Sequence, residues 1–318
     1  MQKRILTLED IQKAHNCIEK IVKHTPVLSS DYINNRFGSK LYFKCENLQT
    51  TGSFKFRGAS NAISELCVSN PDVKKVVTHS SGNHGAALAC AAQQHGLSAT
   101  IVMPKTAPKT KQDNVKQYNG NIVFCEPTME SRQSNVQRIL DETGAELIHP
   151  FNDYRIMAGQ GTAALELLTL HPGLNLVLTP VGGGGLLSGS ATAAKGLNPN
   201  IAVMGVEPEI ANDQYLSFHA KKRIGINDPK TIADGLRTTM PGEKPFATIL
   251  EFVDDIVTVS EESIKMAMRV IWEHLKIVVE PSGAVPLAAL IDGKIDVKYQ
   301  HIGIILSGGN LDLDTWKW

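Results

Sequence analysis

The sequence predicts an α/β protein built from open, mostly parallel sheets with helices on both faces. Short apolar runs alternate along the chain with longer segments whose apolar residues recur every three or four positions. This alternation is typical of parallel strands joined by helices that cover the sheet. Glycines punctuate the ends of several apolar runs, and neither a repeat nor a low-complexity linker interrupts the 318 residues.

The short apolar runs are predicted as strands and the longer periodic segments as helices. The strands are expected at 41–45, 75–78, 99–103, 122–125, 176–181, 203–207, 256–259 and 302–306. The helices are expected at 53–66, 83–95, 131–143, 157–170, 261–275 and 282–291, with further helices in most of the remaining intervals.

Two domains are expected, because the chain is long enough for each to have its own core. Residues 73–151 can stand alone as strand, helix, strand, helix, strand, helix. We therefore predict a small mobile domain at 73–151, inserted into a large domain of residues 1–72 and 152–318. Ligands of open α/β sheets collect beyond the carboxyl ends of the strands, so the cleft between the lobes is the expected site.

Composition favours a small-molecule partner over nucleic acid or a membrane. Lys plus Arg (32) equals Asp plus Glu (32), so no net field attracts an anionic polymer or surface. Five cysteines without a Cys-x-x-Cys pair predict neither a disulfide framework nor a zinc site, and they suit the reducing cytoplasm. We recognise no secretory signal in the sequence. No apolar run reaches the ~20 residues that a membrane span needs.

Four consecutive glycines form the most informative motif. Gly182, Gly183, Gly184 and Gly185 directly follow a predicted strand and open a helix. Without Cβ atoms, several backbone N–H groups can approach one anion, and the helix N-terminus adds its positive end. A tight turn alone would need only one glycine. Because neither a G-x-G-x-x-G pattern nor a G-K-[ST] segment is present, the loop is predicted to bind an isolated phosphate monoester.

A second motif, residues 51–58, surrounds Lys55 with the apolar neighbours Phe54, Phe56 and Gly58. Lys55 is expected one turn into a helix that Ser53 caps at its N-terminus. Loss of solvent would disfavour the ammonium form and leave a nucleophilic amine, which is the state that forms an imine with an aldehyde. Taken alone, a helical lysine is more often a solvated surface residue.

Two polar loops follow other predicted strands. Residues 78–85, Thr-His-Ser-Ser-Gly-Asn-His-Gly, bring hydroxyl, amide and imidazole groups to the start of a helix. Such a loop can surround a carboxylate with donors, although an ordinary polar loop with a helix cap is an open alternative. Ser307 closes the last strand and offers one more hydroxyl at a strand end.

In order and spacing, these four motifs resemble those of the fold-type II pyridoxal-phosphate enzymes. Within them the chain looks like the serine racemases and the catabolic serine/threonine dehydratases. The similarity extends from about residue 8 to residue 310 and includes the segments at 24–26, 159–162 and 231–235. The resemblance implies a two-domain fold of the tryptophan synthase β type, with pyridoxal 5'-phosphate bound by the large domain.

The resemblance also implies how the cofactor is held. Lys55 would carry it as a Schiff base and move a proton on one face of the substrate α-carbon. Phe54 and Asn83 would hold the ring, with Asn83 bonded to the phenolic oxygen, and the four glycines would bind the phosphate. Ser307 would meet the pyridine nitrogen, and its neutral hydroxyl need not keep that nitrogen protonated.

The expected function is a serine racemase that interconverts L- and D-serine and also converts serine to pyruvate and ammonia by α,β-elimination. The resemblance assigns the substrate carboxylate to Ser80, Ser81, Asn83 and His84, with Arg132 drawn in on closure. Racemisation needs a second proton carrier opposite the lysine, and the matching position is Ser81. Racemisation and elimination would then both start from one carbanion at the substrate α-carbon.

A divalent cation and ATP are further expectations. Residues 207–213 resemble the cation loop of this group, with Glu207, Asp213 and the Ala211 carbonyl as hard oxygen ligands for Mg²⁺, Ca²⁺ or Mn²⁺. Spacing alone would favour a solvated acidic loop. The resemblance places part of an activating ATP site at Thr50 and Thr51, at a subunit interface, and a homodimer is expected.

Three other functions remain as alternatives. An L-serine/L-threonine dehydratase with little racemase activity would not need Ser81. A β-replacement enzyme is disfavoured by the loop at 80–84, and a non-catalytic amino-acid-binding homologue is disfavoured by the intact Lys55. Because the sequence stops soon after Asn310, the regulatory domain of biosynthetic threonine dehydratases, and with it feedback by isoleucine, is not expected.

Overall fold

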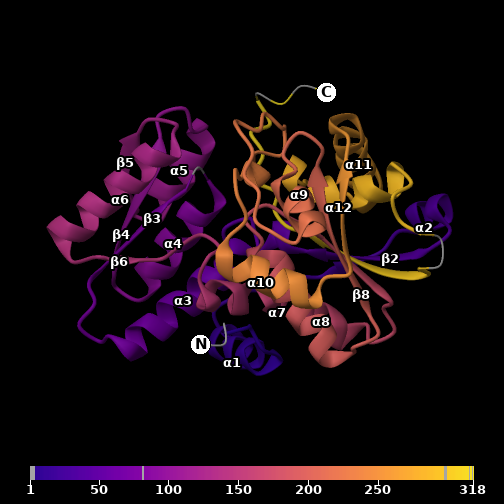
Figure 1. Ribbon diagram of the computed structural model, residues 1–318, viewed down its shortest axis with the longest axis horizontal. Helices are drawn as coiled ribbons and strands as arrows, with labels where there is room; N and C mark the ends of the chain where they lie inside the picture. Colours follow the sequence, from indigo (N-terminus) through magenta and orange to yellow (C-terminus); the bar gives the residue numbers. More distant parts are fainter. Residues whose placement is uncertain (1–3, 81, 297–298, 315, 317) are drawn as a thin grey trace.

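The computed structural model describes residues 4–80, 82–296, 299–314, 316 and 318. Its strands form one six-stranded and one four-stranded sheet, each in its own lobe (Figure 1). All strand pairs but one are parallel. This architecture confirms the predicted fold class.

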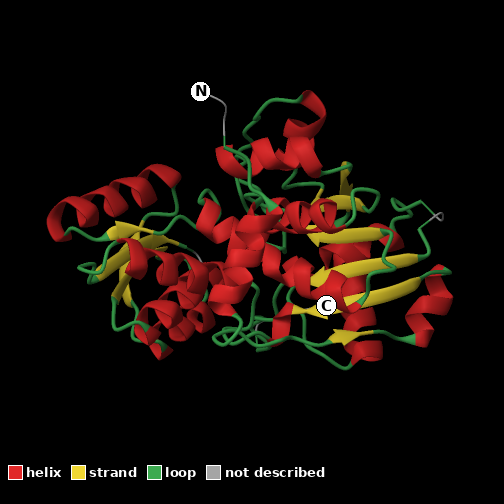
Figure 2. Ribbon diagram, turned by 90° about the horizontal axis from the view of Figure 1, so that it is seen from below, coloured by secondary structure: helices red, strands yellow, loops and turns green. Residues whose placement is uncertain are grey.

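The larger sheet has the strand order β1-β2-β10-β7-β8-β9, and only β1 runs antiparallel to its neighbour. Its strands are β1 (Val27–Leu28), β2 (Lys40–Cys45), β7 (Leu176–Pro180), β8 (Ala202–Pro208), β9 (Asp255–Val259) and β10 (His301–Leu306). Every residue of β7 is buried, as expected for a central parallel strand covered on both faces. Figure 2 shows helices on either side of these strands.

Alternate residues of the central strands face two separate apolar cores. Leu176 and Leu178 pack in the cluster that includes α11 and α12, whereas Val177 packs with α7 and α8. This division follows from the two-residue period of side chains along a strand. The covering helices are α1 (Leu8–Ile18), α7 (Tyr154–Leu170), α8 (Gly185–Leu197), α10 (Glu243–Phe252), α11 (Glu261–Leu275) and α12 (Pro281–Ile291).

The smaller sheet has the order β5-β4-β3-β6 and is parallel throughout. Its strands are β3 (Lys75–His79), β4 (Ser98–Pro104), β5 (Asn121–Cys125) and β6 (Glu146–Leu147), and its helices are α4 (Asn83–Gln94), α5 (Lys109–Gln117) and α6 (Met129–Thr143). Helix α3 (Lys55–Ser69) packs against both α4 and α7 and so joins the two lobes. The mobile character of a domain at 73–151 stays a prediction.

Short elements complete the chain, namely α2 (Asp31–Phe37), α9 (Asp213–Ala220) and the 3₁₀ turns η1 (Glu46–Leu48) and η2 (Asp234–Leu236). All eight predicted strands and all six predicted helices are present, and no end differs by more than three residues. In the part of the chain that the structure describes, no helix is both long and apolar enough for a transmembrane segment.

The predicted start of the helix that carries Lys55 is wrong. The helix begins at Lys55 itself, with Phe54 in the N-cap position and no side-chain cap. Ser53 instead forms an isolated antiparallel bridge with Gly308, in the loop after β10. The Ser53 hydroxyl is buried and makes no hydrogen bond to the described residues, so it does not cap the helix.

Candidate active site

A cavity of about 840 Å³ is lined by residues of both lobes. The carboxyl ends of β3, β7 and β10 each contribute, as the rule for ligands in open α/β sheets predicts. The predicted site residues on its wall are Phe54, Lys55, Ser80, Asn83, His84, Arg132, Gly182, Gly183, Gly184, Gly185 and Ser307. Ser81 lies outside the described residues.

The glycine loop presents free donors and no free acceptors. Among the described residues, the amide N–H groups of Gly183, Gly184 and Gly185 have no acceptor. Every carbonyl of the loop has a donor, because Gly182 O accepts from Gln214 Nε2 at 2.9 Å and Gly183 O from the Gly242 N–H at 3.2 Å. The next two carbonyls accept from the N–H and hydroxyl groups of Ser188 in α8. The loop therefore fits a phosphate group.

Two positions in this loop require glycine. Gly184 has φ +94°, where side chains are rarely found, and a Cβ on Gly183 would come within 2.4 Å of the Phe151 ring. Phe151 thus lies directly against the loop. Larger residues at either position would displace the backbone donors.

Lys55 is a buried amine at the start of α3. Its Nζ donates to the carbonyl oxygen of Pro150 at 3.0 Å and lies 5.2 Å from the Phe54 ring centroid. Burial lowers the pKa of Lys55 to about 8. The amide of Phe54 donates to the Ser307 carbonyl at 3.0 Å, so the lysine motif and the end of β10 are held together.

Asn83 lies in the first turn of α4 and is fixed from two sides. Its Nδ2 donates to Glu280 Oε1 at 2.7 Å, and its Oδ1 accepts from Asn310 Nδ2 at 2.9 Å. A second hydrogen on Nδ2 is available for a phenolic oxygen. Burial raises the pKa of Glu280 to about 7.

The loop after β3 uses one of its predicted substrate groups internally. The Ser80 hydroxyl accepts from the N–H groups of Gly82 and Gly85, at 3.1 and 3.0 Å, and so caps α4. Among the described residues, the N–H groups of Asn83 and His84 have no acceptor, which leaves donors for a carboxylate. Helix capping and anion binding, which the sequence offers as alternatives, are therefore compatible here.

Three imidazoles line the cavity close to Lys55. Burial is the main cause that lowers the pKa of His79 and of His149 to about 4, and that of His84 well below its usual range. His149 Nδ1 accepts from the Asn152 N–H at 2.9 Å, so its proton is on Nε2. All three rings are neutral near pH 7.

Arg132, on α6, is a cation without a described carboxylate partner. Burial lowers its pKa, and its Nε is buried and makes no hydrogen bond to the described residues. It faces the cavity from the smaller lobe. A negatively charged ligand group would satisfy it.

Two of the predicted cation ligands, Glu207 and Asp213, lie together, and none of the three lines the cavity. Glu207, Ala211 and Asp213 are fully buried. Burial and the neighbouring Asp213 raise the pKa of Glu207 well above its usual range, and burial raises that of Asp213 to about 6. No group of three or more His, Cys, Asp or Glu side chains with metal-site geometry occurs in the described ranges. Two adjacent carboxylates are nevertheless hard oxygen donors of the kind that suits a divalent cation.

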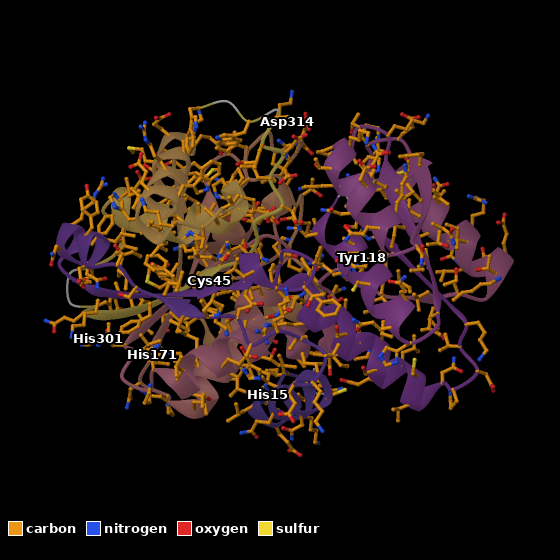
Figure 3. All side chains as sticks on the ribbon, turned by 180° about the vertical axis from the view of Figure 1, so that it is seen from behind. His15, Cys45, Tyr118, His171, His301 and Asp314 are labelled. Atoms are coloured by element: carbon orange, nitrogen blue, oxygen red, sulfur yellow. The ribbon has the colours of Figure 1, made fainter. Side chains whose placement is uncertain are left out.

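The residues assigned to ATP, Thr50 and Thr51, do not line the cavity. The Thr50 carbonyl accepts from the Tyr118 hydroxyl at 3.3 Å, and Figure 3 shows Tyr118 at the junction of the lobes. Thr51 is buried, and its carbonyl accepts from Asn310 Nδ2 at 2.9 Å. ATP binding stays a prediction.

Sequence reasoning missed several cavity residues that interact over long separations. Lys111 on α5 forms an ion pair with Asp234 in η2, 123 positions away, and Asn83 bonds Glu280 across 197 positions. A usable signal existed for Glu280, because it precedes a proline at the first position of a helix, where cap residues are found.

Comparisons with known proteins agree with this geometry. The sequence model described as "Pyridoxal-phosphate dependent enzyme" matches residues 18–308. A serine racemase of Dictyostelium discoideum is 47% identical over 317 residues, covering 98% of this chain and 96% of that protein. A β-hydroxyaspartate dehydratase of Paracoccus denitrificans is 43% identical over 314 residues, covering 99% of this chain and 99% of that protein. The structure of maize serine racemase matches with a TM-score of 0.95 and 44% identity, over 98% of this chain and 96% of that one.

Proposed function

This chain belongs to the pyridoxal-phosphate dependent enzymes, in their racemase and dehydratase group, and on that premise we propose that it is a serine racemase that also eliminates serine to pyruvate and ammonia. The observation that carries the proposal is the placement of a buried lysine amine and a glycine loop with free N–H donors on one cavity. When bound, the cofactor supplies an electron sink that acidifies the substrate α-carbon.

Lys55 is proposed to move the proton on one face of that carbon. Because burial lowers its pKa to about 8, the amine can both accept and return a proton near neutral pH. The free N–H groups at the start of α4 would hold the substrate carboxylate beside it. The neutral imidazoles of His79, His84 and His149 add no competing charge.

Ser81 is proposed as the proton carrier on the opposite face. Its neighbours Ser80 and Gly82 line the cavity, which supports this role. A dehydratase needs no second carrier, because loss of the β-hydroxyl follows removal of the α-proton from one face. With carriers on both faces, we expect racemisation as well as elimination of serine.

The direct test is to incubate the holoenzyme with L-serine and to quantify D-serine and pyruvate in the same sample. Both products should accumulate, and D-serine as substrate should yield L-serine. Formation of pyruvate without D-serine would assign the chain to the serine/threonine dehydratases instead. Neither product, with cofactor bound, would leave the non-catalytic homologue or a dehydratase for another β-hydroxy amino acid.

A second candidate is a dehydratase for a β-hydroxy dicarboxylic amino acid, as the relative from Paracoccus denitrificans is named. The observation that favours it is Arg132, whose Nε is buried without a described partner at the cavity wall. A second substrate carboxylate would pair with it. If so, β-hydroxyaspartate should have a higher kcat/KM than serine, and Arg132→Gln should remove most of that preference.

We further propose a divalent cation at Glu207, Asp213 and the Ala211 carbonyl. The chemical support is the adjacency of two buried carboxylates, of which Asp213 raises the pKa of Glu207. Chelation should lower the melting temperature and Mg²⁺ or Ca²⁺ should restore it, because a ligand at 100 times its Kd adds about 2.7 kcal/mol of stability. Asp213→Ala should mimic chelation. An unchanged melting temperature in metal-free buffer would contradict the site.

A further inference from the structure

The carbonyl oxygens of the glycine loop must point away from a bound phosphate, and one of them depends on a side chain. The carbonyls of Gly183, Gly184 and Gly185 accept from the main chain or from Ser188 of the same helix. Among the described residues, Gly182 O is the one loop carbonyl that accepts from a distant side chain, Gln214 Nε2, at 2.9 Å. Without that donor, a buried carbonyl would be free to turn toward the anion.

We propose that Gln214 is a positioning residue that holds the phosphate loop open for its anion and couples it to the acidic pair of Glu207 and Asp213. The first part rests on the cofactor family and the second on the proposed cation site. Gln214 is fully buried and touches the loop closely, since a Cβ on Gly184 would lie 2.8 Å from its Nε2.

The connection to the acidic pair runs through the backbone of the same residue. The Gln214 N–H donates to Glu207 Oε1 at 3.3 Å, and the next amide, of Tyr215, donates to Glu207 Oε2 at 2.9 Å. Asp213 is the first residue of α9 and Gln214 the second. Any movement of the two carboxylates therefore moves the residue that holds Gly182.

A second contact runs parallel to the first. The Thr238 hydroxyl donates to Asp213 at 3.1 Å, and its methyl group would lie 3.5 Å from a Cβ on Gly182. Thr238 also lines the cavity. Both routes join the acidic pair to the same end of the glycine loop.

The physical basis of coupling is electrostatic. Two adjacent buried carboxylates repel each other when both are ionised, and a divalent cation between them reverses that force. The cation would fix the first turn of α9, hence the Gln214 amide and the Gly182 carbonyl. Linkage then requires cation and cofactor to raise each other's affinity by the same factor.

The first experiment needs no metal and no activity. In chelator-treated protein from which the cofactor has been removed, affinity is measured by equilibrium dialysis against pyridoxal 5'-phosphate and, separately, against pyridoxal, which lacks the phosphate. Gln214→Met, which keeps the length but removes the donor, should raise the Kd for pyridoxal 5'-phosphate about 10-fold, the loss expected for one buried hydrogen bond. The Kd for pyridoxal should change less than about 2-fold, because only the phosphate meets the loop.

Ser217→Ala is the matched control. Ser217 is equally buried on α9, but its hydroxyl bonds Ile224 rather than the loop. It should leave both affinities unchanged. An equal loss of both ligands in Gln214→Met, or a phosphate-specific loss in Ser217→Ala, would overturn the role of Gln214 in the loop.

The second experiment tests the coupling. In the parent protein, Ca²⁺ should lower the Kd for pyridoxal 5'-phosphate by about 5-fold or more, within the usual range of coupling between sites. In Gln214→Met, calorimetry should still detect Ca²⁺ binding, while the effect on the cofactor falls below about 2-fold. Full coupling in the variant, or no Ca²⁺ binding by the parent, would overturn the coupling. Because no serine assay is involved, failure of the racemase proposal would be seen separately.

Discussion

The Lys55 amine has one hydrogen-bond acceptor among the described residues, the carbonyl oxygen of Pro150. A neutral acceptor of this kind does not restore the solvation that an ammonium ion loses on burial. The pKa of Lys55 is consequently lowered to about 8. The apolar neighbours of Lys55 in the sequence suggested such an amine, but taken alone they were a weak signal, and the resemblance to a cofactor family was needed to single out this lysine.

This environment predicts the pH dependence of cofactor capture. Only a neutral amine attacks an aldehyde, so cofactor-free protein should bind pyridoxal phosphate covalently at a rate that rises with pH through about 8. If the amine had the pKa of a free lysine side chain, this rate would instead rise through pH ~10.4. Stopped-flow absorbance gives the profile, and borohydride reduction with peptide mapping gives the residue. A midpoint near 10, or label on another lysine, would refute the assignment.

At the same scale, Ser81→Ala should separate the two proposed activities. Interconversion of L- and D-serine should fall ~10²-fold or more, the usual effect of removing a positioned acid–base group. Pyruvate formation from L-serine should persist in part, because Lys55 can remove the α-proton of one enantiomer. D-serine dehydration should fall with racemisation. Ser80→Ala is a useful comparison, since its hydroxyl caps α4 and its loss should affect stability first. Racemisation at the parent rate in Ser81→Ala would exclude a proton-transfer role.

At the scale of elements, α3 is anchored by a buried ion cluster two residues beyond Lys55. Arg57 is fully buried and donates to Glu46 at 2.7 Å and to Glu166 at 2.6 Å. Lys44 on β2 also donates to Glu166, at 2.6 Å. The cluster contains two cations and two carboxylates, so its charges balance. It joins β2, η1, α3 and α7 at the point from which the lysine projects.

Removal of one member should therefore be costly. Arg57→Met keeps much of the volume but leaves Glu46 and Glu166 with too little positive charge, and breaking a buried pair in this way costs about 3–5 kcal/mol. Urea denaturation measures the change. The control, Arg138→Met, breaks an exposed pair with Glu142 on α6 and should cost under about 1 kcal/mol. Equal effects of the two substitutions would show that the buried cluster does not stabilise α3.

At the scale of the whole molecule, the sequence predicted what depends on near neighbours. Periodicity located the strands and helices, and the glycine loop and Ser307 follow strands whose carboxyl ends meet at one edge. It missed what depends on distant partners. Nothing in the segment around Lys111 indicates a pairing with Asp234, and Gln214 gave no signal because its role arises only when α9 packs beside Gly182. Such contacts are set by the tertiary fold, which local patterns do not encode.

The ion pair of Lys111 and Asp234 spans the cavity between the lobes. Lys111 belongs to α5 of the smaller lobe, and Asp234 to η2 of the larger one. Burial lowers the pKa of Lys111, but the carboxylates of Asp234 and Glu280 outweigh it and raise the pKa overall. The lysine is therefore charged at working pH, and the pair favours the arrangement in which the two walls of the cavity face each other.

If this pair holds the walls together, Lys111→Met should weaken substrate binding more than cofactor binding. In the proposed function the substrate carboxylate is held by the start of α4 in the smaller lobe, whereas the cofactor phosphate is held by the glycine loop between β7 and α8 of the larger lobe. We expect KM for L-serine to rise about 10-fold, because the loss of one charge-assisted contact costs ~1.5 kcal/mol. The Kd for the cofactor should stay within about 2-fold of the parent value. Lys109→Met is the control, because Lys109 lies on the same helix but is exposed and pairs only within α5. A parallel loss of cofactor in Lys111→Met would mean that the pair supports the fold of the cofactor site rather than closure over the substrate.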